Sequence, residues 1–398
     1  MPKGEYLQYG GQAIIEGVMM RSPRYFAVAC RAPNGEIVLD SEPLEKTWIG
    51  RQKWLKLPFF RGTWALLDAM TLGVKAMRFA ANVQMAPEYQ KEDEAPAVPE
   101  PKPMWIRVLT GIVVLLLGLA MLAVAVGPFV PYVQQRRVWQ LALVVVGIVF
   151  AWSGFVSLYN ALTGKEETAE SQKRVQDMAV GATVVFSLVF GMFLFNYVPN
   201  AIAETFFRGR DVRNGTIINY GVETIKVVFF IGYISLIAQM KEIKEVFKYH
   251  GAEHKAINTL EAHQPLEMEY CRKQTRLHPR CGTSFAIIVL IVSFILMPLV
   301  PRYWITGGQG ANWLLDVTAR FFLEIFLLLP IVAGIAYELI RFAGKFRNTA
   351  FVNVLFQPGL MSQYMTTREP RDDQIEVALT ALKACIDQEE SHDARERG

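Results

Sequence analysis

The sequence predicts a mainly α-helical, polytopic membrane protein with a small β-hairpin-containing unit at its N-terminus and a helix at its C-terminus. Two observations predict this class. Of the 398 residues, 52% are hydrophobic and only 20% are charged, so the mean hydropathy is positive, at +0.23. The hydrophobic residues also gather in runs as long as the roughly 20 residues that a helix needs to cross a bilayer.

Residues 1–85 are expected to form a cytoplasmic unit before the membrane domain. Segment 26–39 holds two short apolar runs joined by Asn34-Gly35, which is the strongest two-residue signal for a β-hairpin. Segment 59–84 is apolar but interrupted by charges, a pattern that suits an amphipathic helix at the membrane surface or packed on other helices. No apolar core of a signal peptide occurs near the start, so we expect no export of this unit.

A linker is expected at 86–103, because five prolines and an acidic cluster prevent this stretch from forming a core. The membrane domain follows at 104–343. Its six expected spans are residues 108–128, 140–161, 178–198, 219–240, 283–301 and 321–340. The fourth and sixth spans contain charged residues, which we expect near the interfaces or facing other helices.

The distribution of Lys and Arg predicts how the spans are oriented. The loop at 241–281 carries eight of these residues: Lys241, Lys244, Lys248, Lys255, Arg272, Lys273, Arg276 and Arg280. The flank after the last span is also basic, and the loops on the other side hold fewer cations. We therefore expect a cell-membrane protein with the 241–281 loop and both termini in the cytoplasm.

The remaining segment, 344–398, is expected to be a cytoplasmic tail. Pro358-Gly359 predicts a turn, and a broad apolar stripe predicts a helix from about Asp372 to Ile386.

Charge and cysteine content exclude several classes of protein. A net charge of +4 is small for this length and gives no case for binding nucleic acid. The four cysteines are too few and too scattered for a disulfide framework. In the cytoplasm they would be reduced and free to bind metal. No phosphate-binding glycine loop, dinucleotide fingerprint or Ser–His–Asp order stands out.

Four of the five histidines fall between residues 250 and 278. His250 and His254 lie four residues apart and share one face if the segment is helical, with Glu253 alongside. His-x-x-Glu-His is the inverted form of the metalloprotease motif, in which two histidines hold zinc and the glutamate activates water. The alternative is a pair of surface histidines and a salt-bridged glutamate. The clustering of histidines favours a metal site.

His278 and Cys281, in the segment His-Pro-Arg-Cys, are expected to add nitrogen and thiolate ligands. Together with the two helical histidines they make four protein ligands, which is typical of a closed structural zinc site. If one of the four does not bind the ion, a position stays open for water and Glu253 becomes its general base. Cys271 is a fifth and weaker candidate.

Three further charged residues are candidate site residues. Glu16 and Arg21 interrupt an otherwise apolar run, and for Glu16 the simpler interpretation is a hydrogen-bonded residue at a sheet edge. Arg280 adjoins the expected ligands. It would hold an anionic group or contact lipid phosphate, the more common role of a single Arg at an interface.

Several longer motifs point to one family: GGQAIIEGVMMRSP (10–23), PNGEIV (33–38), FFRGTWALL (59–67), YHGAEHK (249–255), LHPRCGTSF (277–285), AYELIRFAGK (336–345) and a C-terminal TTREP (366–370). In these the chain resembles the YqhQ-like family of bacterial membrane proteins, a domain of unknown function described as predicted metal-dependent enzymes. The resemblance covers most of the chain. It implies a multi-pass membrane protein with cytoplasmic soluble parts.

Two functions are consistent with these patterns. The first is a hydrolase that uses zinc or another divalent metal to cleave a peptide or lipid-derived bond at the membrane surface. The second is a non-catalytic biogenesis, scaffold or partner-binding protein with a structural metal. In either case the expected partners are the lipid bilayer and either another protein or a second copy in the membrane.

Overall fold

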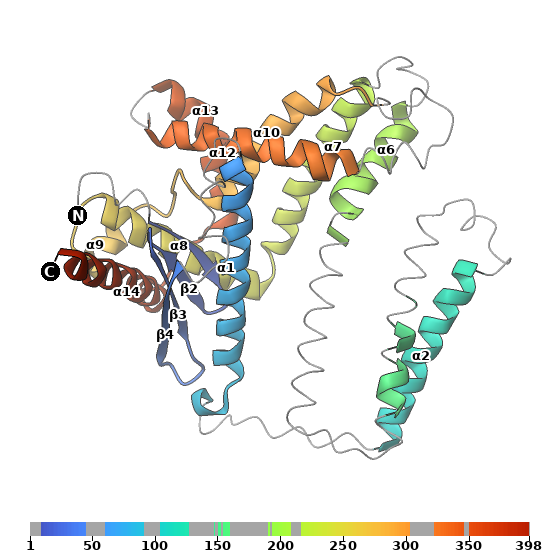
Figure 1. Cartoon of the computed structure of the whole chain (residues 1–398), viewed down its shortest axis with the longest axis horizontal. Coiled ribbons are helices and arrows are strands. Elements are labelled where there is room, and N and C mark those ends of the chain that lie inside the picture. Colours follow the sequence, from blue (N-terminus) through green and yellow to red (C-terminus); the bar gives the residue numbers. More distant parts are fainter. Residues whose placement is uncertain are drawn as a thin grey trace.

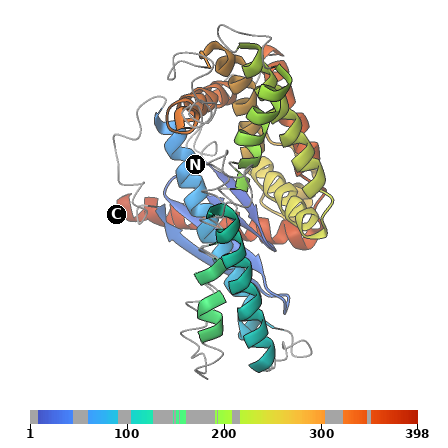
Figure 2. The same cartoon turned by 90° about the vertical axis from the view of Figure 1, so that its right-hand side faces the viewer.

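A computed structural model of the chain describes residues 9–44, 60–90, 104–126, 147, 150–152, 154–159, 190–191, 193–207, 216–302, 322–345 and 350–397. The protein is mainly helical with one four-stranded antiparallel sheet near the N-terminus, as the sequence predicts (Figure 1). In both views the sheet lies to one side of the helices α10 (Gly282–Leu296) and α12 (Leu329–Lys345) (Figures 1 and 2).

The strands follow one another in the sheet in chain order: β1 (Gly10–Ile14), β2 (Gly17–Arg21), β3 (Tyr25–Arg31) and β4 (Ile37–Pro43). The hairpin expected around Asn34-Gly35 is confirmed, since these residues connect β3 to β4. Gly35 has φ +92°, a conformation that residues with a Cβ rarely adopt. The apolar run before this hairpin forms a second one, β1–β2.

Helices cover both faces of the sheet. Phe26, Val28 and Cys30 of β3 pack toward α1 (Phe60–Met85), and the alternating Ala27 and Ala29 pack toward α8 (Lys241–Glu261) and α14 (Asp372–Arg397). Successive side chains of a strand point to opposite faces, so a strand covered on both sides is apolar throughout. The amphipathic helix expected at 59–84 corresponds to α1, which packs on the sheet and on α12.

Two helices of the described residues are long and apolar enough to cross a bilayer. These are α7 (Thr216–Ile237) and α10 continued by the 3₁₀ turn η8 (Met297–Leu299), which correspond to the spans expected at 219–240 and 283–301. Shorter apolar helices occupy Met104–Ala120 and Phe326–Ile340. Most of 140–161 and 178–198 lies outside the described residues. The six-span topology therefore stays a prediction.

The remaining elements are mostly short helices: η5 (Pro87–Tyr89), α2 (Met104–Val126), the π-helical η7 (Phe193–Tyr197) and η9 (Glu324–Leu328), α6 (Val198–Phe207), α9 (Met268–Lys273) and α13 (Ala350–Thr366). The linker expected at 86–103 begins with η5, and its residues 91–103 lie outside the described part.

In the C-terminal segment, one expectation is wrong and another is confirmed but too short. The turn predicted at Pro358-Gly359 is wrong, because both residues lie inside α13. Gly359 packs against Ser284 of α10, and this contact between α13 and α10 holds the helix together across the proline. The C-terminal helix begins at Asp372 as expected but continues beyond Ile386 to Arg397.

Helix α8 is held closely against the segment that follows α13. The backbone N–H of Arg368 donates to the Phe247 carbonyl oxygen at 2.9 Å. A Cβ atom on Gly251 would overlap the Arg368 carbonyl oxygen, so this approach requires glycine. Glycine here lets α8 and the segment 366–370 share one interface.

We predict that Gly251→Ala destabilises the protein by about 1–3 kcal/mol, the usual cost of forcing extra atoms into a packed site. Gly232→Ala in α7 is the matched control, because nothing lies within 4 Å of its added Cβ. That change should be neutral or stabilise its helix by up to about 1 kcal/mol. The thermal unfolding midpoint of detergent-purified protein measures both. Equal midpoints for the two variants would contradict the tight contact at Gly251.

Candidate metal centre

Three side chains that the sequence singled out converge between α8 and α10. His250 and His254 project from α8, and Cys281 is the residue that caps the N-terminus of α10. Their ligand atoms all lie within 4.8 Å of one another, and the two imidazole centroids are 4.4 Å apart. Among the described residues this is the one group of three such side chains. The cluster is mostly buried, with His254 only 1% exposed.

Backbone carbonyls orient both imidazoles. Nδ1 of His250 lies 2.8 Å from the Thr366 carbonyl oxygen, and Nδ1 of His254 lies 2.6 Å from the Arg276 carbonyl oxygen. A carbonyl oxygen only accepts, so in each ring Nδ1 must carry the proton. The lone pair of each neutral ring is then on Nε2. Metal-binding histidines typically have this support, with the second nitrogen bonded to a carbonyl or carboxylate.

Both Nε2 atoms face the shared space. Nε2 of His250 is 3.1 Å from the Cys281 sulfur. Nε2 of His254 is buried and has no hydrogen-bond partner. A buried polar atom without a partner is rare and costly, and a bound ion would supply the missing interaction.

Cys281 supplies the sulfur atom of the cluster. The Cys281 sulfur accepts a hydrogen bond from the backbone N–H of Thr283 at 3.4 Å, at the N-terminus of α10. A helix N-terminus stabilises negative charge. Two imidazoles and one thiolate are ligands that zinc accepts, so the residues present fit the metal that the sequence suggested.

Glu253 borders the cluster from the same helix. Its Oε2 lies 3.5 Å from Nε2 of His254, and its side chain is almost fully buried. Burial raises the pKa of the Glu253 carboxyl to about 7, although His250 and a hydrogen bond from the Gly11 backbone lower it. The carboxylate therefore sits where it faces both the histidines and strand β1.

Gly11 is a site residue that sequence reasoning missed. A Cβ at this position would lie 2.6 Å from Cγ of Glu253, so glycine is needed for β1 to approach the carboxylate. The available signal was the Gly10-Gly11 pair at the start of the first long motif. Nothing in the sequence linked that pair to α8.

His278 lies beside the three-residue cluster without joining it. Its ring centroid is 5.6 Å from that of His254, and its Nε2 is 3.3 Å from Oε1 of Glu261. Gln363 holds its backbone, accepting from the N–H at 2.8 Å and donating to the carbonyl at 2.6 Å. Burial lowers the pKa of the His278 imidazole, against the opposing effect of Glu261. Of the four side chains expected as ligands, His250, His254 and Cys281 lie together and His278 lies beside them.

The other candidate residues are not part of the cluster. Cys271 is fully buried in the core between α8, α14 and the sheet. Glu16, in the β1–β2 turn with φ +50°, accepts a hydrogen bond from the Tyr249 hydroxyl at 3.1 Å. Arg21 of β2 pairs with Asp68 of α1 at 2.7 Å, and Arg280 pairs with Glu261. These residues connect elements to one another.

A family model described as Protein of unknown function (DUF1385) matches residues 57–163 and 143–388. The chain belongs to this family. The DUF1385 protein is also similar to "Uncharacterized protein YqhQ" of Bacillus subtilis (strain 168), with 28% identity over 383 residues that cover 95% of this chain and 92% of the relative. The resemblance to a YqhQ-like family is thereby confirmed. No solved structure matches the chain.

We predict that His250→Ala, His254→Ala and Cys281→Ala each remove most of the bound metal, because each deletes one of three converging ligands. Cys271→Ala is the matched control, since that thiol lies in the core and outside the cluster. Elemental analysis of purified protein, scored as ions per chain, makes the comparison. Full metal occupancy in the Cys281→Ala protein would rule out the three-ligand arrangement.

Proposed function

We propose that this DUF1385 protein is a membrane-bound hydrolase that uses zinc or another divalent ion held by His250, His254 and Cys281. The convergence of two imidazoles and a thiol, with the buried Nε2 atom of His254 lacking a hydrogen-bond partner, supports the proposal. Three protein ligands leave a fourth position for water or substrate, as in catalytic zinc sites.

Glu253 is the catalytic base of this proposal. When bound, a divalent ion supplies Lewis-acid polarisation of water or of a substrate oxygen. Glu253 accepts the proton of the attacking water and returns it to the leaving group as the bond breaks. The Gly11 N–H holds the carboxylate, which projects from α8 beside the histidines. Glu253 is therefore already in position to accept the proton.

The proposed location is the cell membrane, with six spans and with both termini and the metal centre on the cytoplasmic side. In support, the basic segment 241–281 is directly flanked by α7 and α10, the two helices long enough to cross a bilayer. The proposed partners are the lipid bilayer and either another membrane protein or a second copy of the chain. The small net charge gives no reason to propose a nucleic-acid partner.

A scaffold with a structural metal is the second candidate function. One observation favours it: the His278 ring lies 5.6 Å from that of His254, and its imidazole is the nearby side chain that could serve as a fourth ligand. A closed site would tie α8 to α10 and contribute to folding without catalysis.

The variant Glu253→Gln separates the two candidates. It keeps the shape of the side chain and removes the base, so we expect unchanged metal content and protein level but loss of function. The measurement is complementation of a strain that lacks the protein, read beside metal content. His250→Ala is the companion variant, since it should lose metal under either hypothesis. Full complementation by Glu253→Gln would exclude the hydrolase.

Topology provides a separate test. The four native cysteines are buried, so a single introduced cysteine can be labelled with little background. We expect Lys273→Cys, in the basic segment, to react with a membrane-impermeant maleimide only after the cells are opened. Pro301→Cys, beyond the far end of α10, is the control and should react in intact cells. Labelling of both in intact cells would contradict a cytoplasmic metal centre.

A further inference from the structure

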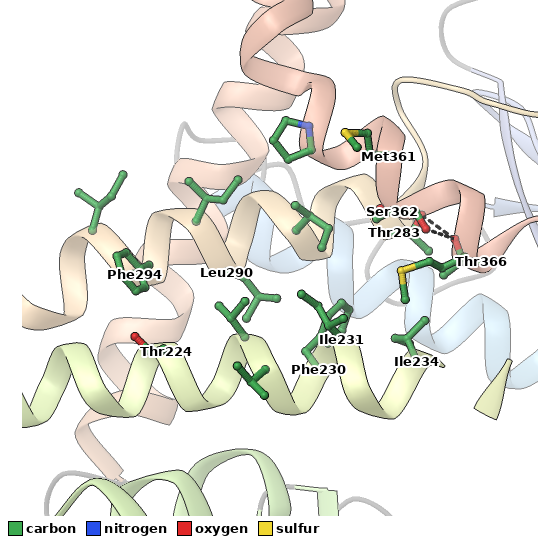
Figure 3. A pocket seen from close by; sticks show the side chains of 17 residues that line it. Thr224, Phe230, Ile231, Ile234, Thr283, Leu290, Phe294, Met361, Ser362 and Thr366 are labelled. Atoms are coloured by element: carbon green, nitrogen blue, oxygen red, sulfur yellow. Dashed lines mark hydrogen bonds between the residues drawn. The ribbon is translucent and has the colours of Figure 1, made fainter. Parts of the chain in front are cut away.

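An apolar groove of about 900 Å³ lies between α7, α10 and α13 (Figure 3). Its walls are mostly aliphatic and aromatic side chains, among them Phe230, Ile231, Leu290, Phe294 and Met361. This volume lies within the range of small-molecule sites, roughly 300–1,000 Å³. Two of the three wall helices are the candidate membrane spans. Hydrocarbon would therefore be the natural surroundings of the groove.

Three of the four polar residues that line the groove gather at one end. Thr283, Ser362 and Thr366 lie together there, with the hydroxyl oxygens of Thr283 and Thr366 3.5 Å apart (Figure 3). Thr224 lies farther along α7, and its hydroxyl donates to the Tyr220 carbonyl of its own helix at 2.8 Å. The groove is thus mostly apolar along its length, and its hydroxyl groups are concentrated at the end formed by Thr283, Ser362 and Thr366.

That polar end adjoins the candidate metal centre. The carbonyl oxygen of Thr366 accepts from Nδ1 of His250, and the hydroxyl of Thr283 lies 3.2 Å from the Cys281 sulfur. The same two residues therefore line the groove and contact the ligands. This end of the groove is therefore one residue away from the side chains of His250 and Cys281.

Two basic residues lie close in the chain to the groove-lining segments: Arg368 follows Thr366 by two residues, and Lys241 follows the end of α7 by four. The Arg368 guanidinium donates to the Ala238 carbonyl at 3.3 Å, just past the C-terminus of α7, and Lys241 is exposed at the start of α8. Basic side chains at a membrane boundary attract anionic lipid head groups. Arg368 and Lys241 are therefore the side chains that would pair with an anionic head group at this end.

We propose that the groove binds the hydrocarbon chain of an anionic lipid and places its head group beside His250 and Cys281. This inference rests on the proposed hydrolase function and names its substrate class, a lipid-linked bond. An extended peptide fits less well, because its backbone N–H and C=O groups would be unpaired along the apolar walls. A hydrocarbon chain has no such groups.

The test is a binding titration with a single-chain phosphatidylglycerol that carries a fluorophore at the end of its chain. Detergent-purified full-length protein is titrated as wild type, Ile231→Trp and Leu290→Trp, which fill the groove from opposite walls. Leu236→Trp is the control, since this exposed residue lies on α7 outside the groove. Metal content and thermal unfolding are measured for every variant, so that a folding defect is recognised.

We expect each groove variant to bind the lipid at least tenfold more weakly with unchanged metal content, and Leu236→Trp to bind within twofold of wild type. A phosphocholine lipid with the same chain should bind more weakly than the phosphatidylglycerol. Wild-type affinity in both folded groove variants would overturn the inference, as would displacement of the lipid by an apolar helical peptide at lower concentration. Equal binding of the phosphatidylglycerol and the phosphocholine lipid by wild-type protein that holds metal refutes only this inference. Lipid binding to a protein that holds no metal refutes the proposed hydrolase and leaves the groove assignment standing.

Discussion

The burial of a polar stretch of α8 is the constraint on which the rest of the structure depends. Glu253, His254 and Lys255 are each at most 5% exposed, and buried polar groups are costly unless they find partners. Three separate parts of the chain supply them: the Gly11 backbone for the glutamate, the Arg276 carbonyl for the histidine, and the Arg272 carbonyl with Glu369 for the lysine. The sheet, the 268–281 connection and the segment after α13 are therefore all positioned by one turn of one helix.

This arrangement also places the candidate metal centre at a boundary. On one side lie the sheet and α14, which form a hydrophobic core with α8. On the other side α7 and α10 have the length and composition of membrane helices. Cys281 caps the N-terminus of α10, where the sheet-containing part meets the apolar helices. The candidate centre therefore lies between the buried polar groups of α8 and the apolar groove. A reaction on a lipid-linked bond would use both sides of this boundary.

Much of the local structure was predictable, because it depends on neighbours in the sequence. The turn conformation of Gly35, the helix that begins at Asp372 and the helical spacing of the two histidines all follow from short-range geometry. The turn expected at Pro358 failed for the opposite reason. A proline weakens a helix locally, but α13 is held by its packing along α10, and that packing was not visible in the sequence.

The sequence by itself determined which residue types were available for metal chemistry and that His250 and His254 share a helix face. Only the tertiary structure decided which others join them. Cys281, 31 residues along the chain from His250, reaches the histidines because α10 starts against α8, whereas His278 is held by Glu261 and Gln363. Gly11 enters the site from a distant strand through its backbone, a contribution that no side-chain pattern reveals. The reason is physical: spacing along a helix follows from its local geometry, but convergence of separate segments depends on how their buried surfaces pack together.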